Sequence, residues 1–137
     1  MSRIAFIFPG QGSQAIGMGK ELADAFPAAK AVFDEVDAAL GEKLSALIWG
    51  GSIEELTLTA NAQPALMAVS LAASRALEAG FGVKISTAAF VAGHSLGEYS
   101  ALAAAGAISV TDAARLLRKR GQAMQAAAPA GTGAMAA

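Results

Sequence analysis

Residues 87–97, TAAFVAGHSLG, lead from a short apolar stretch directly into a turn of small residues. The apolar run at 87–92 predicts a buried β-strand, because it is short and uninterrupted. A helical pattern follows the turn to about Ala105 and stops at Gly106. A strand that passes through a sharp turn into a helix is the building unit of an α/β fold, so we predict an α/β protein with a parallel sheet.

The turn itself, GHSLG at 93–97, matches the G-x-S-x-G pattern of a nucleophile elbow. Such an elbow lifts the serine hydroxyl above the sheet at a helix N-terminus, where the backbone N–H of Leu96 would face an oxyanion. We therefore predict Ser95 as a catalytic nucleophile. The alternative is a capping box, in which Ser95 only caps the helix N-terminus and the Glu98 side chain hydrogen-bonds back to it.

The chain has a single histidine, His94, directly before this serine. In a tight turn its side chain should point away from the neighbouring hydroxyl, so we predict a structural role for it. A mechanism that needs a separate histidine base must find it outside this chain.

The other elements follow from apolar periodicity and from glycine and proline positions. Residues 3–8, ended by Pro9, predict a second buried strand. Helical patterns lie at 18–40, with Pro27 opening a second helix and Gly41 as its stop, near 44–49, at 62–79 before Gly80, and at 111–128, before a turn at 129–133. Strands separated by long helical stretches imply a parallel sheet with more members, so we expect a fragment of a longer protein, proteolytic or deliberate.

The loop GQGSQA at 10–15 follows the first strand and formally matches the dinucleotide fingerprint G-x-G-x-x-A. Pro9 breaks the strand-to-helix run, and the acids about 20 residues on, Asp34 and Glu35, fall inside a helical pattern, which weakens a dinucleotide-binding interpretation. The loop could instead supply the N–H of Gln11 as a second oxyanion donor, or be a plain glycine turn.

A lone cation lies on the apolar face of the last predicted helix. At 100° per residue, Leu116, Leu117 and Met124 belong to one apolar arc, and Arg118 belongs to the opposite, solvated face. Arg120 falls inside the apolar arc. A charge there must be paired or must line a cavity, and a guanidinium fits a carboxylate. Recognition of a substrate carboxylate, a structural ion pair and a snorkelling side chain all remain open.

Composition excludes several classes of protein. Of 137 residues, 55% are hydrophobic and 15% are charged, which excludes disorder, and the net charge of −1 gives no basic excess for nucleic acid. The absence of cysteine excludes thiolate metal sites. With no membrane-length apolar stretch and no leader pattern, we expect a cytoplasmic protein without a metal or cofactor.

Four segments, PGQGSQ, NAQPALMAVS, GHSLGEYSALAAAG and RGQAMQ, resemble the malonyl-CoA:acyl-carrier-protein transacylases of fatty-acid synthesis, in the expected order. The acyltransferase domains of polyketide synthases share these motifs. The resemblance implies that residues 1–128 form part of an α/β-hydrolase-like large subdomain. It also implies that residues 129–137 form a turn and the start of an inserted ferredoxin-like small subdomain.

The resemblance implies site roles as well. Ser95 would be the nucleophile, the N–H groups of Gln11 and Leu96 the oxyanion hole, and Arg120 the clamp on the malonyl carboxylate, with Gln63 nearby. The implied partners are malonyl-CoA and acyl-carrier protein. The catalytic histidine of the family lies beyond this chain, so we expect the chain alone to be inactive and to pack against a second chain carrying the C-terminal remainder.

Overall fold

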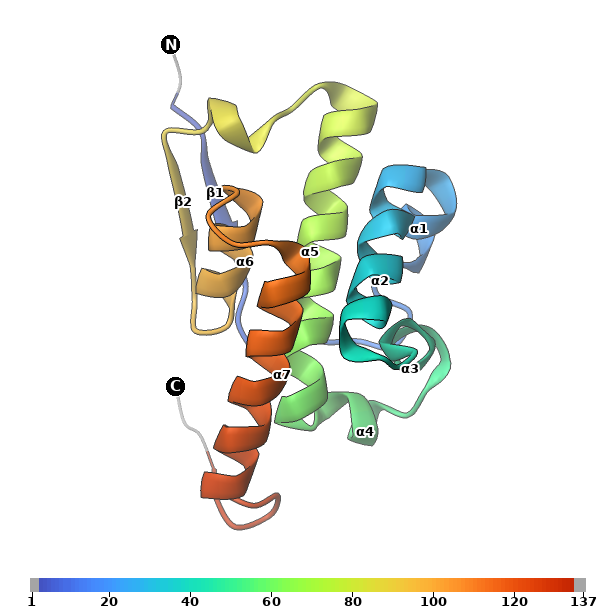
Figure 1. Ribbon diagram of the computed structural model, residues 1–137, viewed down its shortest axis with the longest axis vertical. Helices are drawn as coiled ribbons and strands as arrows, with labels where there is room; N and C mark the ends of the chain where they lie inside the picture. The colour runs from blue at the N-terminus through green and yellow to red at the C-terminus, as the bar shows by residue number, and fades with distance from the viewer. Residues whose placement is uncertain (1–2, 135–137) are drawn as a thin grey trace.

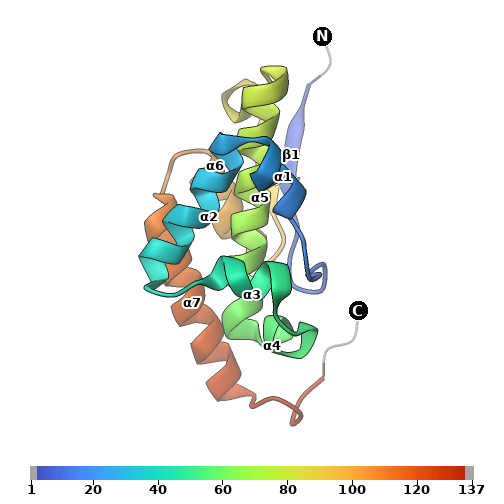
Figure 2. The ribbon, with the colours of Figure 1, turned by 90° about the vertical axis from the view of Figure 1, so that its right-hand side faces the viewer.

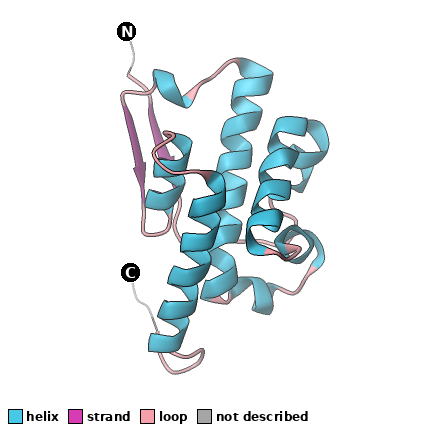
Figure 3. Ribbon diagram, in the orientation of Figure 1, coloured by secondary structure: helices cyan, strands magenta, loops and turns pink. Residues whose placement is uncertain are grey.

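Helices make up most of the computed structural model, which describes residues 3–134 (Figures 1 and 3). Two strands, β1 (Ala5–Phe8) and β2 (Phe90–Gly93), lie at one side of the helices. In chain order the helices are α1 (Lys20–Ala25), α2 (Pro27–Leu40), α3 (Leu44–Gly50), α4 (Ile53–Thr57), α5 (Thr59–Phe81), the 3₁₀ turn η1 (Ile85–Thr87), α6 (Gly97–Ala104) and α7 (Val110–Ala127). No helix in this part of the chain is both long and apolar enough to span a membrane.

The two strands pair in parallel, with Phe8 opposite Gly93 at their carboxyl ends. This confirms the predicted α/β class with a parallel sheet. Because carboxyl ends of parallel strands share one edge, the loop after β1 and the turn after β2 lie side by side.

The prediction that both strands are buried is wrong for the described residues. Ile7 is 78% exposed and Phe90 is 66% exposed. Helix α6 contacts both strands, but the described chain places no second layer over these two side chains. An apolar run identifies a strand, but its burial depends on what packs against the sheet.

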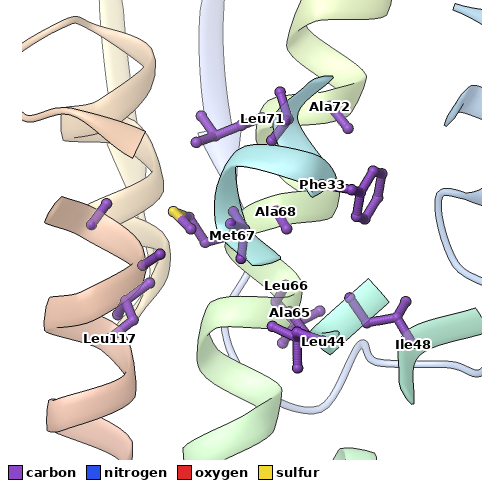
Figure 4. Packing of buried hydrophobic residues seen from close by; sticks show 14 of the residues in the cluster. Phe33, Leu44, Ile48, Ala65, Leu66, Met67, Ala68, Leu71, Ala72 and Leu117 are labelled. Carbon is purple, nitrogen blue, oxygen red and sulfur yellow. The ribbon is translucent and has the colours of Figure 1, made fainter. Parts of the chain in front are cut away.

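Helix α5 forms the centre of the core and contacts both α2 and α7, as the view in Figure 2 shows. Met67 and Leu71 of α5 belong to the same buried cluster as Phe33 of α2 and Leu117 of α7 (Figure 4). Each such buried side chain contributes roughly 1.5–3 kcal/mol relative to an exposed one. The backbones of α5 and α7 also approach closely, since a Cβ on Gly121 would lie 2.6 Å from Ala60 Cα.

Several helix boundaries follow the sequence signals, but helix α4 was not predicted, and α5 begins at Thr59 rather than at 62 and ends later than predicted. Pro27 opens α2, and Gly41 ends it in a left-handed conformation at φ 65°. Helix α5 does not stop before Gly80 but continues to Phe81, and Gly82 is its left-handed C-cap at φ 68°. Gly80 is instead a packing position, because a Cβ there would lie 2.8 Å from the Phe26 ring.

The predicted turn after the last helix is present from Pro129, where the N–H of Thr132 donates to the Pro129 carbonyl at 3.0 Å. The expected start of a small subdomain at 129–137 falls partly on 135–137, which lie outside the described residues.

Candidate active site

The elbow between β2 and α6 forces a strained serine. Ser95 has φ 54°, and no other non-glycine residue in the described range has a positive φ. A Cβ on Gly93 would overlap the backbone of Gly97, and a Cβ on Gly97 would overlap the Phe8 carbonyl. Both glycines are therefore required by close approach of backbone, and a left-handed serine costs on the order of 1–2 kcal/mol.

The capping-box alternative for Ser95 is wrong. The N-cap of α6 is Leu96, without a side-chain cap, and the N–H of Glu98 donates to the Ser95 carbonyl oxygen at 3.1 Å. The Ser95 side chain is exposed, and its Oγ accepts a hydrogen bond from Arg120 Nη2 at 3.1 Å.

The glycine-rich loop after β1 lies directly beside this elbow. The His94 N–H donates to the Phe8 carbonyl at 3.1 Å, and a Cβ on Gly10 would lie 2.9 Å from the His94 carbonyl. The N–H groups of Gln11 and Leu96 donate to no acceptor among residues 3–134. Both donors, one from each loop, are thus unused by the described residues.

The same loop lacks the geometry of a dinucleotide site. The fingerprint needs a helix N-terminus at its glycines, but the next helix begins only at Lys20. Asp34 lies within α2 and pairs with Lys30, Nζ to Oδ2 at 2.6 Å. Asp34, which would bind the ribose in a dinucleotide site, is therefore held in an ion pair within α2.

Side chains of two other helices, α5 and α6, lie against the Arg120 guanidinium beside Ser95. Nη1 donates to Gln63 Oε1 of α5 at 2.7 Å, and Cζ lies 5.7 Å from the ring centroid of Tyr99 on α6. Gln63 is fully buried, and its Nε2 donates to Met124 Sδ at 3.3 Å. No carboxylate of residues 3–134 forms a salt bridge with Arg120. Two of its five N–H donors are used, which leaves three for a ligand.

The prediction that Arg118 belongs to a solvated face is wrong. Its side chain is 15% exposed, forms a salt bridge with Glu42 and donates to the Ala60 carbonyl at 2.7 Å. Burial lowers the pKa of the Arg118 guanidinium. Leu116 and Met124, predicted within the apolar arc, are 46% and 43% exposed. Arg118 is therefore a structural cation that ties α7 to α5 and to the turn that follows α2.

Hydrogen bonds thus join Ser95, Arg120 and Gln63 directly, and the loop carrying Gln11 lies against the elbow. Tyr99 was not predicted as a site residue, although its position four residues after Ser95 places it about one helical turn from that serine. His94 is exposed and forms no hydrogen bond with Ser95 in the described structure.

An apolar groove of about 420 Å³ opens beside the site, with Gln11 and Met124 in its wall. Among residues 3–134, no cluster of histidine and acidic side chains could hold a metal ion. The arrangement contains an exposed serine, two free backbone donors and a guanidinium without a counter-ion, which together suit acyl transfer from an anionic acyl donor.

Comparison with known proteins gives one consistent family. A family model for the acyl transferase domain matches residues 5–137. The malonyl CoA-acyl carrier protein transacylase of Bacillus subtilis (strain 168) is 61% identical over 138 residues, which cover 100% of this chain and 42% of the relative.

Solved structures that resemble this chain are acyl transferases as well. The acyl-carrier-protein-S-malonyltransferase from Bartonella henselae has a TM-score of 0.88 and 64% identity, over 92% of this chain and 40% of that chain. A malonyl-transacylase, PlMCAT, solved with the type II PKS acyl-carrier protein AntF, has a TM-score of 0.85 and 47% identity over 93% of this chain and 40% of that chain. The chain thus spans well under half the length of these relatives.

Proposed function

The chain belongs to the acyl transferase family, and on that premise we propose that it carries the nucleophile and the carboxylate clamp of a malonyl-CoA:acyl-carrier-protein transacylase. The observation that carries the proposal is the 3.1 Å hydrogen bond from Arg120 Nη2 to Ser95 Oγ. It places a permanent cation beside the nucleophile, where the far carboxylate of a short diacid group would lie. A generic serine hydrolase has no need of such a cation.

The reaction proceeds through a malonyl ester. Ser95 Oγ attacks the thioester carbonyl of malonyl-CoA and gives up its proton to a base. The N–H groups of Gln11 and Leu96 stabilise the oxyanion of the tetrahedral intermediate. The carbon–sulfur bond breaks, and the base returns its proton to the departing sulfur, so that CoA leaves as the free thiol. The phosphopantetheine thiol of acyl-carrier protein then attacks the malonyl ester, and the same steps in reverse restore Ser95.

Arg120 selects the acyl group by its carboxylate. Gln63 fixes Nη1 through a fully buried amide, so the guanidinium is oriented before substrate binds. The N–H donors that remain free can then form charge-assisted hydrogen bonds with the malonyl carboxylate.

The base lies outside these 137 residues. His94 is the only histidine, and its position before Ser95 in the turn does not direct it to the hydroxyl. We place the base in the part of a full-length relative that this chain does not match, on the same polypeptide or on a second chain carrying it. In the same proposal residues 1–128 belong to an α/β-hydrolase-like subdomain and residues 129–137 begin a ferredoxin-like one. A cytoplasmic location stays a prediction.

A second candidate is malonyl transfer to a polyketide carrier protein. It is favoured by one observation, the 47% identity to a malonyl-transacylase solved with a type II PKS carrier protein. The two candidates share the chemistry at Ser95 and differ only in the carrier that docks.

The experiment compares malonyl-CoA with acetyl-CoA in the full-length protein. A charge-assisted hydrogen bond contributes roughly 1.5–3 kcal/mol, so Arg120→Ala should lower kcat/KM for malonyl-CoA by about 10- to 100-fold. Acetyl-CoA has no carboxylate and should lose little. Arg120→Lys should restore only part of the activity, because an ammonium cannot form the bidentate fork.

Lys119→Ala is the matched control, since Lys119 is an exposed neighbour on the same helix. If Arg120→Ala lowers the melting temperature and reduces both transfers equally, Arg120 is a structural residue and the proposed malonyl selectivity fails.

A further inference from the structure

Among residues 3–134, Tyr99 is the aromatic side chain that lies against the Arg120 guanidinium. It lies one turn into α6, four residues after Ser95, and Arg120 Cζ lies 5.7 Å from its ring centroid. We infer that Tyr99 is a positioning residue, whose ring face holds the Arg120 guanidinium at Ser95 and so sets the preference for acyl groups that end in a carboxylate. The inference rests on the proposed function and deepens it.

The contacts of Arg120 divide into two kinds. Gln63 and Ser95 accept hydrogen bonds from Nη1 and Nη2, which fixes the ends of the fork. The ring of Tyr99 attracts the whole cation through its quadrupole and limits how far the guanidinium can swing out of the site. Because Ser95 is exposed and its Oγ changes partners during the reaction, Gln63 and Tyr99 are the two supports that persist.

A neutral ring suits this position better than a carboxylate would. An aspartate or glutamate beside Arg120 would occupy the N–H donors and neutralise the charge that the substrate needs. A cation–π contact leaves the donors free and the charge uncompensated. The absence of any salt bridge from Arg120 to residues 3–134 agrees with this arrangement.

The role of the Tyr99 hydroxyl can be tested apart from the role of its ring. No hydrogen bond of that hydroxyl is present among the described residues. Tyr99→Phe therefore keeps the ring face, whereas Tyr99→Leu keeps an apolar side chain and removes the ring. The pair separates cation–π support from simple packing.

The test measures kcat/KM for malonyl-CoA and for acetyl-CoA in the full-length protein. Tyr99→Leu should lower malonyl transfer by about 3- to 10-fold and leave acetyl transfer nearly unchanged. Tyr99→Phe should keep most of the malonyl preference. In an Arg120→Ala background, Tyr99→Leu should produce no further loss of preference, because its effect passes through Arg120.

Leu102→Ala is the control on α6, since Leu102 is an apolar side chain of the same helix and is 41% exposed. Equal losses for both substrates, or a malonyl preference that survives Tyr99→Leu with only a lower melting temperature, would overturn the inference. These outcomes leave the proposed function standing if Arg120→Ala still abolishes the preference. If Arg120→Ala keeps the malonyl preference, the proposed role of Arg120 in selectivity is itself wrong, and the inference about Tyr99 falls with it.

Discussion

Arg118 and Arg120 are two residues apart on α7 and have opposite surroundings. Arg118 pairs with Glu42 and also donates to the Ala60 carbonyl at 2.7 Å. Arg120 has the hydroxyl of Ser95 and the amide of Gln63 as acceptors, and no carboxylate of residues 3–134 pairs with it. One cation is paired with a carboxylate of the described chain and the other is not, and in the proposed function the second is the one that binds the substrate carboxylate.

Substitution of Arg118 should therefore affect stability and not selectivity. Arg118→Ala leaves the Ala60 carbonyl without its charged donor, so it should lower the free energy of unfolding by about 1–3 kcal/mol. The ratio of malonyl to acetyl transfer should stay at the wild-type value. Urea unfolding and the two transfer rates, measured on the full-length protein, check this. A changed ratio with unchanged stability would show that Arg118 contacts substrate.

The helical wheel of α7 predicted that Arg120 lies within the apolar arc, but it assigned Arg118 wrongly to the solvated face. Buried Ala114 and Gly121 centre the true arc away from exposed Leu116, so the two arginines flank it on opposite sides. A helical wheel groups positions by residue type alone, so it cannot show that α7 packs against both α5 and α2. The same limit hid Tyr99, because its contact comes from a different helix.

At the scale of elements, the strand, elbow and helix that carry Ser95 could be predicted from the residues alone. The pattern G-x-S-x-G fixes the turn because side chains at Gly93 and Gly97 would overlap backbone. The exposure of the strands and the late stop of α5 at Gly82 could not be predicted, since both depend on what packs against the element.

Gly97→Ala should separate the two loops of the site. Its Cβ would meet two backbone carbonyls, those of Phe8 and Pro9, and backbone cannot move aside as a flexible side chain can. We expect acyl transfer to fall at least 100-fold, roughly the effect of losing an oxyanion donor, or the protein to lose stability. The measurements are transfer rate and melting temperature.

Gly50→Ala is the matched control, because a Cβ at Gly50 would have no atom within 4 Å. Wild-type transfer by Gly97→Ala would show that the elbow and the loop after β1 need not touch for activity.

At the scale of the whole molecule, the proposed mechanism needs a base that these 137 residues do not place at Ser95. In the proposed function the chain contains the nucleophile, two N–H donors and the clamp, but its one histidine forms no hydrogen bond with Ser95 in the described structure. The 137-residue chain alone should therefore transfer malonyl groups far below an enzymatic rate. Addition of a polypeptide with the remaining part of a full-length relative should restore transfer. Robust turnover by the purified chain, with no second polypeptide by mass spectrometry, would contradict this expectation.

The central claim is that Ser95 accepts the acyl group. The full-length protein is incubated with malonyl-CoA, quenched, digested and mapped by mass spectrometry. We predict one malonyl adduct on Ser95, discharged by acyl-carrier protein and absent in Ser95→Ala, while Ser100→Ala, which alters a buried serine of α6, keeps it. An adduct on another residue, or malonyl transfer retained by Ser95→Ala, would contradict the account.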